Sequence, residues 1–427
     1  MTAAPHTAPT GALTRLLGTT NRRATIALLV CWAFVIFDGY DLIVYGNVIS
    51  HLQDDWGISA STAGTLGSLA FLGMMVGAVV AGRISDHVGR RHAILGCAIV
   101  LSVFTVACAF ATGPEMFGVF RFIAGLGLGG LVPTVNALAA ELVPERRRAV
   151  IATIMMSGVP IGGSIAALVG IPVIPAWGWR PMFLFALIPL VLLVPLALKF
   201  FPDTVRRDTS STHRVGFGAL FTPNFRAATI LFALTTMVTL LAWYGLGTWL
   251  PKLMQKSGTD LGSALTFALA LNLGAVAGSF ITAWAATRIG PIRTGIIAAF
   301  IAGAALLLLL TGPAVGVVYA IFVLAGVGTH GTQCLIIAAV ATFYPDRLRG
   351  TALGWALGVG RIGAVAAPQI GGWLIAAGLG ANSNFVLFGV SALIASALLA
   401  VIGFGLRNPK SDNDNTNTTS TTALPAV

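Results

Sequence analysis

The sequence predicts an all-α membrane protein with twelve transmembrane helices, arranged as two six-helix halves around a central cavity. Three observations lead to this prediction. Of the 427 residues, 56% are hydrophobic and only 9% are charged, a composition expected where lipid is the solvent. Twelve apolar runs are long enough to cross a bilayer, and two loop motifs recur at one constant spacing.

Each predicted helix rests on an apolar run of about 20 residues, the length that spans the hydrocarbon core of a bilayer. The first run is about 26 residues long and carries two acids, which indicates a retained helix rather than a cleaved signal. The twelve runs lie approximately at residues 24–49, 61–82, 93–112, 116–140, 149–174, 181–201, 227–250, 262–286, 294–311, 314–341, 352–377 and 384–406.

The basic residues predict the orientation of these helices. With the N-terminus in the cytoplasm, 20 of the 25 Lys and Arg residues fall in cytoplasmic segments and three fall outside. This asymmetry is the positive-inside pattern, so we expect a multi-pass protein of a bacterial plasma membrane with both termini in the cytoplasm. The formal charge of +11 is therefore an orientation signal, and a nucleic-acid partner is not expected.

The chain is predicted to divide into five segments. A cytoplasmic tail at 1–23 precedes the first half at 24–202, and a charged cytoplasmic loop at 203–225 leads to the second half at 226–406. The C-terminal tail at 407–427 is polar and low in complexity, which is typical of a disordered segment.

Two cytoplasmic loops indicate that a six-helix unit is duplicated. The segment GRISDHVGRR at 82–91 has a counterpart 201 residues later, in which Gly290 matches Gly89. The next pair of loops repeats the offset, because PERRRA from Pro144 pairs with PDRLRG from Pro345. Parallel repeats of this kind meet around a midplane cavity in many transporters.

The charged residues within the membrane do not follow the repeat. Asp38, Asp41 and Arg121 match uncharged residues of the second half, whereas Arg361 and His330 match uncharged residues of the first half. Residues that only build the scaffold should be alike in both halves. These five are therefore the stronger candidates for function.

Three motifs carry a resemblance to a known family. GRISDHVGRR resembles the G-x-x-x-D-x-x-G-R-R signature of the major facilitator superfamily, and Arg121 with GLGLGG from Gly125 resembles its fourth-helix pattern. The segment DGYD at 38–41 resembles the D-G-x-D signature of the aromatic acid:proton symporters. The resemblance implies the major facilitator fold, an essential transport role for Asp38 and Asp41, and a conformational role for the loop at 82–91.

Asp38 and Asp41 are predicted to couple protons to transport. A charge at the centre of a membrane helix costs about 2.5–3.5 kcal/mol, so such residues usually face a partner or a water-filled path. Residues at i and i+3 share one face of a helix, and a carboxylate in changing surroundings takes up and releases a proton. The alternative is that one of the two only pairs with Arg121.

Arg121 and Arg361 are the two cations predicted within the membrane. A guanidinium binds a carboxylate through two parallel hydrogen bonds, so both are candidates for holding an anionic substrate. For Arg121 the alternative is an ion pair with an acid of the first helix. His330 is a candidate for contact with substrate or proton, or else a packed neutral residue, and Gln333 shares its face three residues on.

Tyr45, Trp243 and Tyr244 are candidates for contact with an aromatic ring of the substrate. Ring pairs that meet edge-on or offset gain about 0.5–1.5 kcal/mol beyond the burial of their area. Membrane helices are rich in aromatic residues in any case, so packing is the alternative for each of them.

Charged residues at the cytoplasmic helix ends are predicted to gate the transport cycle. Asp86, Arg90 and Arg91 would lock helix ends together in the outward-facing state, and Glu141 with Arg147 would form a second lock. For the arginines, the alternative is a role in orientation alone.

These features predict a proton-coupled secondary transporter that imports a small aromatic carboxylate, of the benzoate or hydroxybenzoate type, by alternating access. The alternatives are a proton-linked carrier of an aliphatic acid or a sugar, a drug-efflux antiporter, and a transporter-like sensor. The sequence has no Gly-rich phosphate loop, catalytic triad or metal-ligand spacing, so an enzyme, a cofactor and a bound metal are not expected. A monomer is expected.

Overall fold

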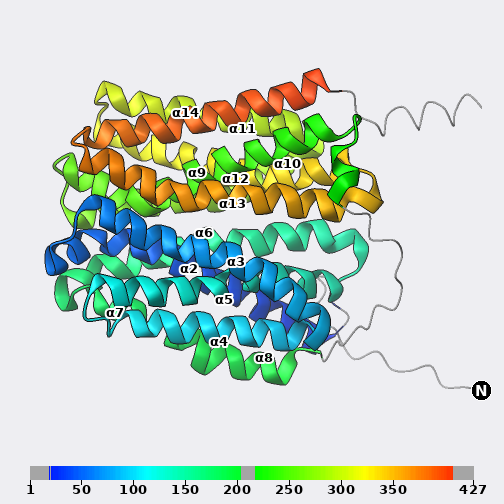
Figure 1. The fold of residues 1–427 in the computed structure, drawn as a ribbon, viewed down its shortest axis with the longest axis horizontal. Coiled ribbons are helices and arrows are strands. Elements are labelled where there is room, and N and C mark those ends of the chain that lie inside the picture. Colours follow the sequence, from blue (N-terminus) through cyan, green and yellow to red (C-terminus); the bar gives the residue numbers. More distant parts are fainter. Residues whose placement is uncertain (1–18, 20, 203–216, 407–427) are drawn as a thin grey trace, which may run out of the picture.

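Long helices that run side by side make up the molecule. The computed structural model describes Thr19, residues 21–202 and residues 217–406. In this part of the chain the helices lie roughly parallel to one another and share two common ends (Figure 1). The predicted N-tail up to residue 18, the stretch 203–216 of the central loop, the C-tail at 407–427 and the side chain of Asp86 lie outside the described residues.

The first half begins with five long helices and ends with a broken span. Each long helix overlaps the apolar run that predicts it. They are α2 (Arg22–Trp56), α3 (Ala60–Val88), α4 (Arg90–Cys108), α5 (Pro114–Glu141) and α6 (Arg148–Trp177).

The sixth span is interrupted, where the sequence predicts one helix at 181–201. It consists of α7 (Arg180–Leu184), the π-helix η2 (Pro189–Leu193) and α8 (Val194–Phe200). Pro189 has no N–H to donate, so the regular helical bond to the carbonyl four residues earlier cannot form. The Val194 N–H bonds to the Pro189 carbonyl five residues earlier, which closes the wider turn of a π-helix.

The second half contains six further helices. They are α9 (Arg226–Lys256), α10 (Leu261–Ile289), α11 (Pro291–Leu308), α12 (Val315–Phe343), α13 (Asp346–Ala376) and α14 (Gly380–Ala400). Eleven spans among the described residues are long and apolar enough to cross a membrane. The twelfth is α13, 31 residues long, whose charged residues at positions 346, 347, 349 and 361 lower its mean hydropathy. The prediction of an all-α protein with twelve membrane helices is confirmed.

The loops that reveal the repeat have matching backbones. Gly89 and Gly290 have φ and ψ of 86° and 158°, and of 86° and 156°. Positive φ values of this kind favour glycine. Pro144 and Pro345 also agree, with ψ of 153° in both.

Two helix N-termini, those of α3 and α10, also lie 201 residues apart, although their sequences share no motif. The Ser59 side chain accepts a hydrogen bond from the Thr62 N–H, and the Asp260 side chain accepts one from the Ser263 N–H. Both are N-caps, which satisfy a backbone donor that the helix itself leaves unpaired. Serine and aspartate do this equally well, so the structural repeat survives the change of residue.

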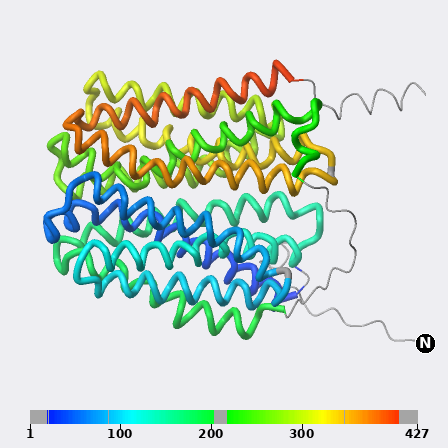
Figure 2. Tube along the Cα trace, in the orientation of Figure 1, coloured from blue at the N-terminus to red at the C-terminus, as the bar shows by residue number. Residues whose placement is uncertain are grey.

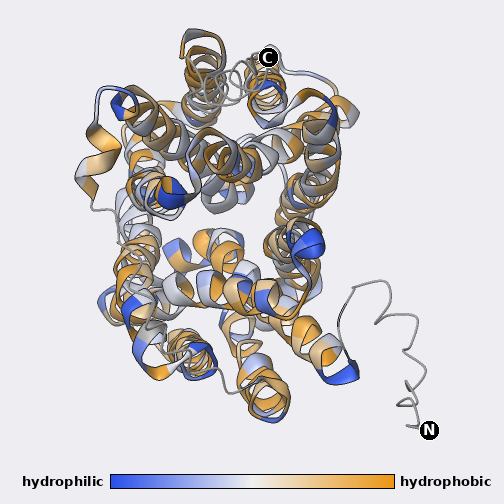
Figure 3. Cartoon of the chain, turned by 90° about the vertical axis from the view of Figure 1, so that its right-hand side faces the viewer, coloured by the Kyte–Doolittle hydropathy of each residue, from blue (hydrophilic) through white to orange (hydrophobic). Residues whose placement is uncertain are grey.

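Within each half, the outer helices pack on a central one in the same way. In the first half α3 and α4 pack on α5, and in the second half α10 and α11 pack on α12. The chain trace shows the two halves lying against each other (Figure 2). Apolar residues cover the outside of the bundle (Figure 3), where lipid would surround it.

The halves meet along three helix pairs, which are α2 with α9, α3 with α13 and α6 with α10. We call the end of the molecule that carries the α3–α4 and α5–α6 loops the basic end, and the other the opposite end. Four hydrogen bonds among the described residues join α2 to α9 and α3 to α13. They are Ser50 to Gln255 (2.8 Å), Thr65 to Gln369 (2.8 Å), Ser68 to the Val365 carbonyl (2.6 Å) and Arg361 to the Met74 carbonyl (2.6 Å).

Three of these bonds lie between the helix midpoints and the opposite end, and the bond from Arg361 to the Met74 carbonyl lies at the midpoints of α3 and α13. The space around the glycines of α13 also differs between the two ends of the molecule. At the opposite end, a Cβ on Gly372 would overlap the Ala60 carbonyl of the first half, whereas a Cβ on Gly350, Gly354 or Gly358 would meet no atom within 4 Å. The halves are therefore closed together at the opposite end, whereas the glycine positions of α13 toward the basic end face open space.

Candidate functional site

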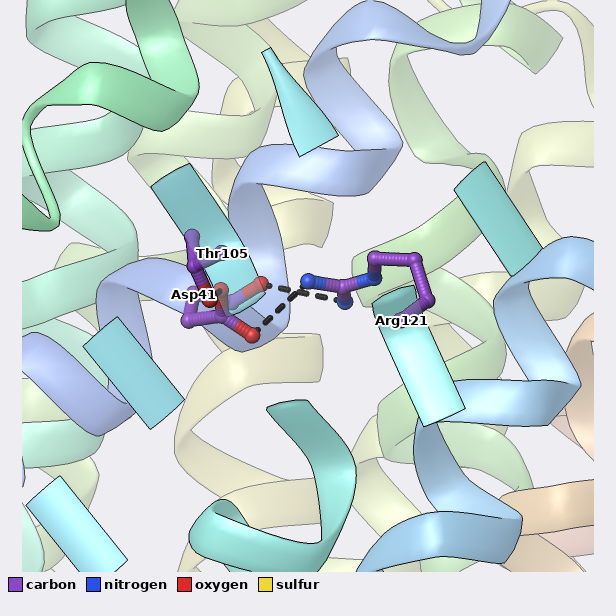
Figure 4. A network of polar contacts seen from close by, with 3 residues as sticks. All are labelled: Asp41, Thr105 and Arg121. Atoms are coloured by element: carbon purple, nitrogen blue, oxygen red, sulfur yellow. Dashed lines mark hydrogen bonds and ion pairs between the residues drawn. The ribbon is translucent and has the colours of Figure 1, made fainter. Parts of the chain in front are cut away.

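Asp41 is held in a closed network inside the first half (Figure 4). Its Oδ2 accepts a hydrogen bond from Nη1 of Arg121 at 2.8 Å, and its Oδ1 accepts one from the Thr105 hydroxyl at 2.6 Å. The other terminal nitrogen of Arg121 reaches the Asp41 carbonyl at 3.4 Å. The ion pair joins α2 to α5, and Thr105 adds α4.

The Asp41–Arg121 pair is almost fully buried, with 3% and 2% of the side chains exposed. The guanidinium also lies 5.7 Å from the centre of the Tyr45 ring, within the range of a cation–π contact. Arg121 thus takes the alternative role that the sequence left open, pairing with an acid of the first helix. Its contact with a substrate stays a prediction.

Asp38 lies on the same helix in different surroundings. It is 2% exposed, and its Oδ1 atom is buried without a hydrogen-bond partner among the described residues. It interacts electrostatically with Asp41 and with Arg361 of the second half. A buried carboxylate oxygen without a partner is costly, so Asp38 is suited to bind a proton or a ligand.

Arg361 lies at the midpoint of α13 and faces the first half. Its Nη1 donates to the Met74 carbonyl of α3 at 2.6 Å, and its charge interacts with Asp38 and Tyr244. The Tyr244 ring packs on Phe71 of α3, with ring centres 4.6 Å apart. Asp38, Arg361 and Tyr244 therefore form a mixed polar and aromatic cluster, which we call the interface cluster, between the halves.

His330 and Trp243 form a second polar group, in the second half. Their ring centres lie 5.1 Å apart, and both rings are buried. The Nδ1 atom of His330 and the Nε1 atom of Trp243 have no hydrogen-bond partner among the described residues, while His330 Nε2 lies 3.9 Å from the Cys334 sulfur. Gln333 is half-buried on the same helix.

Tyr45 lies beside the Asp41–Arg121 pair, where its ring meets the guanidinium. Its hydroxyl donates to the Ala63 carbonyl of α3 at 2.5 Å, and its ring packs against Phe117 at 6.0 Å. The residue is 2% exposed. Both ends of the side chain are therefore engaged in packing α2 against its neighbours.

Two of the residues predicted as gates, Arg90 and Glu141, meet within the first half. Arg90 at the start of α4 pairs with Glu141 at the end of α5 at 2.7 Å, and Arg91 donates to the Leu198 carbonyl at 2.6 Å. Glu141 thus pairs with Arg90, and Arg147 is half-buried in the short 3-10 turn η1 (Glu145–Arg147). The described contacts join one helix end to the next, and a role in gating stays a prediction.

Three partners in these groups were missed from the sequence. Thr105 of α4 donates to Asp41, Phe71 of α3 packs on Tyr244, and Met74 contributes only its carbonyl. The 201-residue offset pairs Thr105 with Leu306. A comparison of polar residues between the two halves could therefore have identified Thr105, as it identified the charged residues. A backbone acceptor such as that of Met74 leaves no trace in the residue type.

The comparison with known families covers nearly the whole chain. Residues 30–368 and 268–426 match the Major Facilitator Superfamily. The chain belongs to the major facilitator superfamily. Its predicted major facilitator fold is also that of solved structures, such as the crystal structure of a D-xylose-proton symporter, with a TM-score of 0.70 and 17% identity over 90% of this chain and 98% of the other.

Relatives within the superfamily are named as transporters of aromatic acids. The chain is 60% identical to the gentisate transporter of Corynebacterium glutamicum, over 91% of this chain and 89% of the relative. It is 34% identical to the benzoate transport protein of Acinetobacter baylyi, over 88% of each. The resemblance to transporters of aromatic acids is thereby confirmed, and this major facilitator protein is a membrane transporter rather than an enzyme.

Proposed function

We propose that this chain imports a small aromatic carboxylate together with protons, and that a hydroxylated benzoate such as gentisate is its substrate. The identity of 60% to a gentisate transporter supports the substrate class. The observation that carries the coupling is the interface cluster, where an unpartnered carboxylate oxygen of one half and a guanidinium of the other interact near the helix midpoints.

The two halves supply different chemistry to this cluster. Asp38 belongs to the first half and has an oxygen available for a proton. Arg361 belongs to the second half and offers a planar fork that fits a carboxylate. Asp41 and Arg121 neutralise each other within the first half, so we assign the proton to Asp38 and the substrate carboxylate to Arg361.

The substrate ring would lie between the two polar groups. Tyr244 is half-buried beside Arg361 and Asp38, and the preceding residue of α9, Trp243, packs on His330 of α12. The buried Nε1 donor of Trp243 has no partner in the described structure. Such a donor suits a ring hydroxyl, because a buried polar group gains most from a partner that completes its hydrogen bonding.

Alternating access would follow from the placement of the contacts between the halves. The described hydrogen bonds hold α3 to α13 from the midpoints of the two helices to the opposite end. If the basic end is cytoplasmic, the structure represents the inward-facing state. Rocking of the halves would separate Arg361 from the Met74 carbonyl and expose the cluster to the outside, where a proton and an anion enter.

The deciding experiment is uptake into proteoliposomes that contain the purified protein. Radiolabelled gentisate, benzoate, 4-hydroxybenzoate and succinate are compared with an imposed proton gradient, acidic outside, and after its collapse by a protonophore. We expect gradient-dependent accumulation of the aromatic acids and none of succinate. Gentisate uptake that is unchanged by the protonophore would refute proton coupling, and accumulation of succinate alone would refute the substrate class.

A further inference from the structure

The first half has an apolar groove on its outer face that the transport function does not use. Helices α3 and α4 each pack along α5 but make little contact with each other. The gap between them holds a groove of about 480 Å³, floored by α5 at Ile123, Leu126 and Gly127. Its walls come from residues 76–84 of α3 and 92–100 of α4.

This groove faces the bilayer rather than the other half. Val76, Val80 and Ile84 on its α3 wall are 39%, 47% and 46% exposed, although each is apolar. The main neighbours of α4 are α5, α3, α7 and α8, all of its own half. Exposed apolar side chains at this depth of a membrane protein meet lipid tails.

A glycine creates the space. A Cβ added to Gly96 of α4 would meet no atom within 4 Å, so the missing side chain leaves the groove open. The 201-residue offset places Ile297 of α11 at the matching position of the second half, where it is 50% exposed. The repeat therefore carries a branched side chain where the first half keeps an opening.

Basic side chains stand at the end of the groove nearest the basic end. His92 lines the groove itself, and Arg83 and His87 are exposed on the last turns of α3. The Nδ1 atoms of His87 and His92 meet the carbonyls of Arg83 at 2.9 Å and Val88 at 3.1 Å, which leaves Nε2 of each ring for another partner. A phosphate is the anion that a membrane surface presents at this level.

We propose that the groove binds one acyl chain of an anionic phospholipid, with the lipid phosphate at Arg83 and His92. The apolar walls match a hydrocarbon chain in shape and polarity, and the opening beside Gly96 admits a chain that a larger side chain would exclude. The basic groups lie at one end of the groove only. A lipid of the leaflet at the basic end is therefore oriented with its phosphate at these groups and its tail along α3 and α4.

Photoreactive lipid labelling tests this site directly. The protein is placed in phosphatidylethanolamine bilayers with a trace of phosphatidylglycerol that carries a diazirine in one acyl chain, and labelled peptides are mapped by mass spectrometry after irradiation. We expect the label to concentrate on residues 76–84 and 92–100. Excess unlabelled phosphatidylglycerol should remove this label at least fivefold more effectively than excess phosphatidylethanolamine.

The matched variants are Gly96→Ile, which copies the residue of the second half, and Gly316→Ile, at another glycine whose Cβ would meet no atom within 4 Å. Gly96→Ile should lower the label in the groove at least fivefold, and Gly316→Ile should leave it unchanged. Gly96→Val gives the same readout with a smaller side chain. Label spread evenly over the apolar surface, label indifferent to Gly96→Ile, or equal competition by the two lipids would overturn the proposal.

Discussion

Asp38 and Asp41 are three positions apart on one helix, yet the fold gives them opposite surroundings. Asp41 has both carboxylate oxygens hydrogen-bonded, to Arg121 and to Thr105. Asp38 has a buried oxygen without a described partner and interacts with Arg361 across the interface. A carboxylate that is already neutralised has little to gain from a proton, which favours Asp38 as the residue that changes its protonation state.

The substitution Asp38→Asn separates coupling from transport. Asparagine has nearly the same shape as a protonated aspartate but cannot release a proton. We expect gradient-driven accumulation of gentisate to be lost, while exchange of labelled for unlabelled gentisate across the liposome membrane continues. Both are measured as tracer flux, and accumulation at the parent level would contradict the assignment.

Asp41→Asn is the control, because it changes the same residue type one turn away. It leaves the Arg121 guanidinium buried without its counter-charge, which costs about 3–5 kcal/mol for a buried pair. We expect the purified Asp41→Asn protein to unfold at a clearly lower temperature than the parent, and Asp38→Asn to unfold close to it. Equal unfolding temperatures for the two variants would show that the described ion pair does not stabilise the fold.

Arg361→Lys tests the anion site. An ammonium keeps the charge but cannot form two parallel bonds to a carboxylate. We expect the apparent KM for gentisate to rise about tenfold, which corresponds to about 1.4 kcal/mol, with Arg146→Lys at an exposed position as the control. An unchanged KM would place the carboxylate elsewhere.

These roles show what the sequence can and cannot supply. The sequence identified Asp38, Asp41, Arg121 and Arg361 as candidates because they are charged residues within apolar runs, where a charge is costly without a partner. The sequence did not say which acid pairs with Arg121, since residues at i and i+3 share a face and only the packing of α2 against α5 decides. It also gave no sign of the Met74 carbonyl, which any residue type would provide.

Helices in this protein approach closely where small residues allow it. A Cβ on Gly46 of α2 would lie 2.3 Å from the Gly247 carbonyl of α9, so two glycines let the helices of opposite halves touch by their backbones. The sequence predicted each long helix from its apolar run but not all of the helix ends, since α2 continues to Trp56 and α3 to Val88, beyond runs predicted to end at 49 and 82. It did not predict the break at Pro189, since three prolines also lie inside the continuous helix α6.

Gly46→Ala tests the contact between α2 and α9. The added methyl group overlaps backbone that cannot move aside, and overpacking of this kind costs about 1–3 kcal/mol. The cost falls on the state that is closed at the opposite end, so we expect the initial rate of gentisate uptake to fall about tenfold at equal protein amounts. Gly316→Ala, where a Cβ would meet no atom within 4 Å, should transport normally; a normal rate in Gly46→Ala would show that closure at this point is not required.

The whole molecule consists of two halves with similar backbone structure but different buried charged residues. Caps, turns and helix packing repeat at an offset of 201 residues, whereas the buried charges do not. On the proposed mechanism, motion of one half against the other would change the contacts between α3 and α13, while each internal network, such as Asp41 with Arg121, would stay whole. The loop motifs were enough to predict this duplication, but the sequence alone could not say at which end the halves touch.

A cross-link between Thr65→Cys and Gln369→Cys tests the motion. The parent side chains are hydrogen-bonded at 2.8 Å between α3 and α13, so a short cleavable thiol cross-linker should join the two cysteines and hold the opposite end closed. We expect uptake to stop after cross-linking and to recover after cleavage with a reductant. Each single variant treated in the same way is the control, and full uptake by the cross-linked protein would rule out separation of the halves at this point.

Because Arg361 donates to the Met74 carbonyl, this backbone acceptor and the substrate carboxylate compete for the same guanidinium. On the proposed mechanism, an anion arriving from the periplasm finds the guanidinium released, whereas one arriving from the cytoplasm competes with an acceptor already in place. Half-saturation should therefore require less solute on the periplasmic face than on the cytoplasmic face, and measuring flux in both directions with right-side-out and inverted vesicles would reveal this one-way bias.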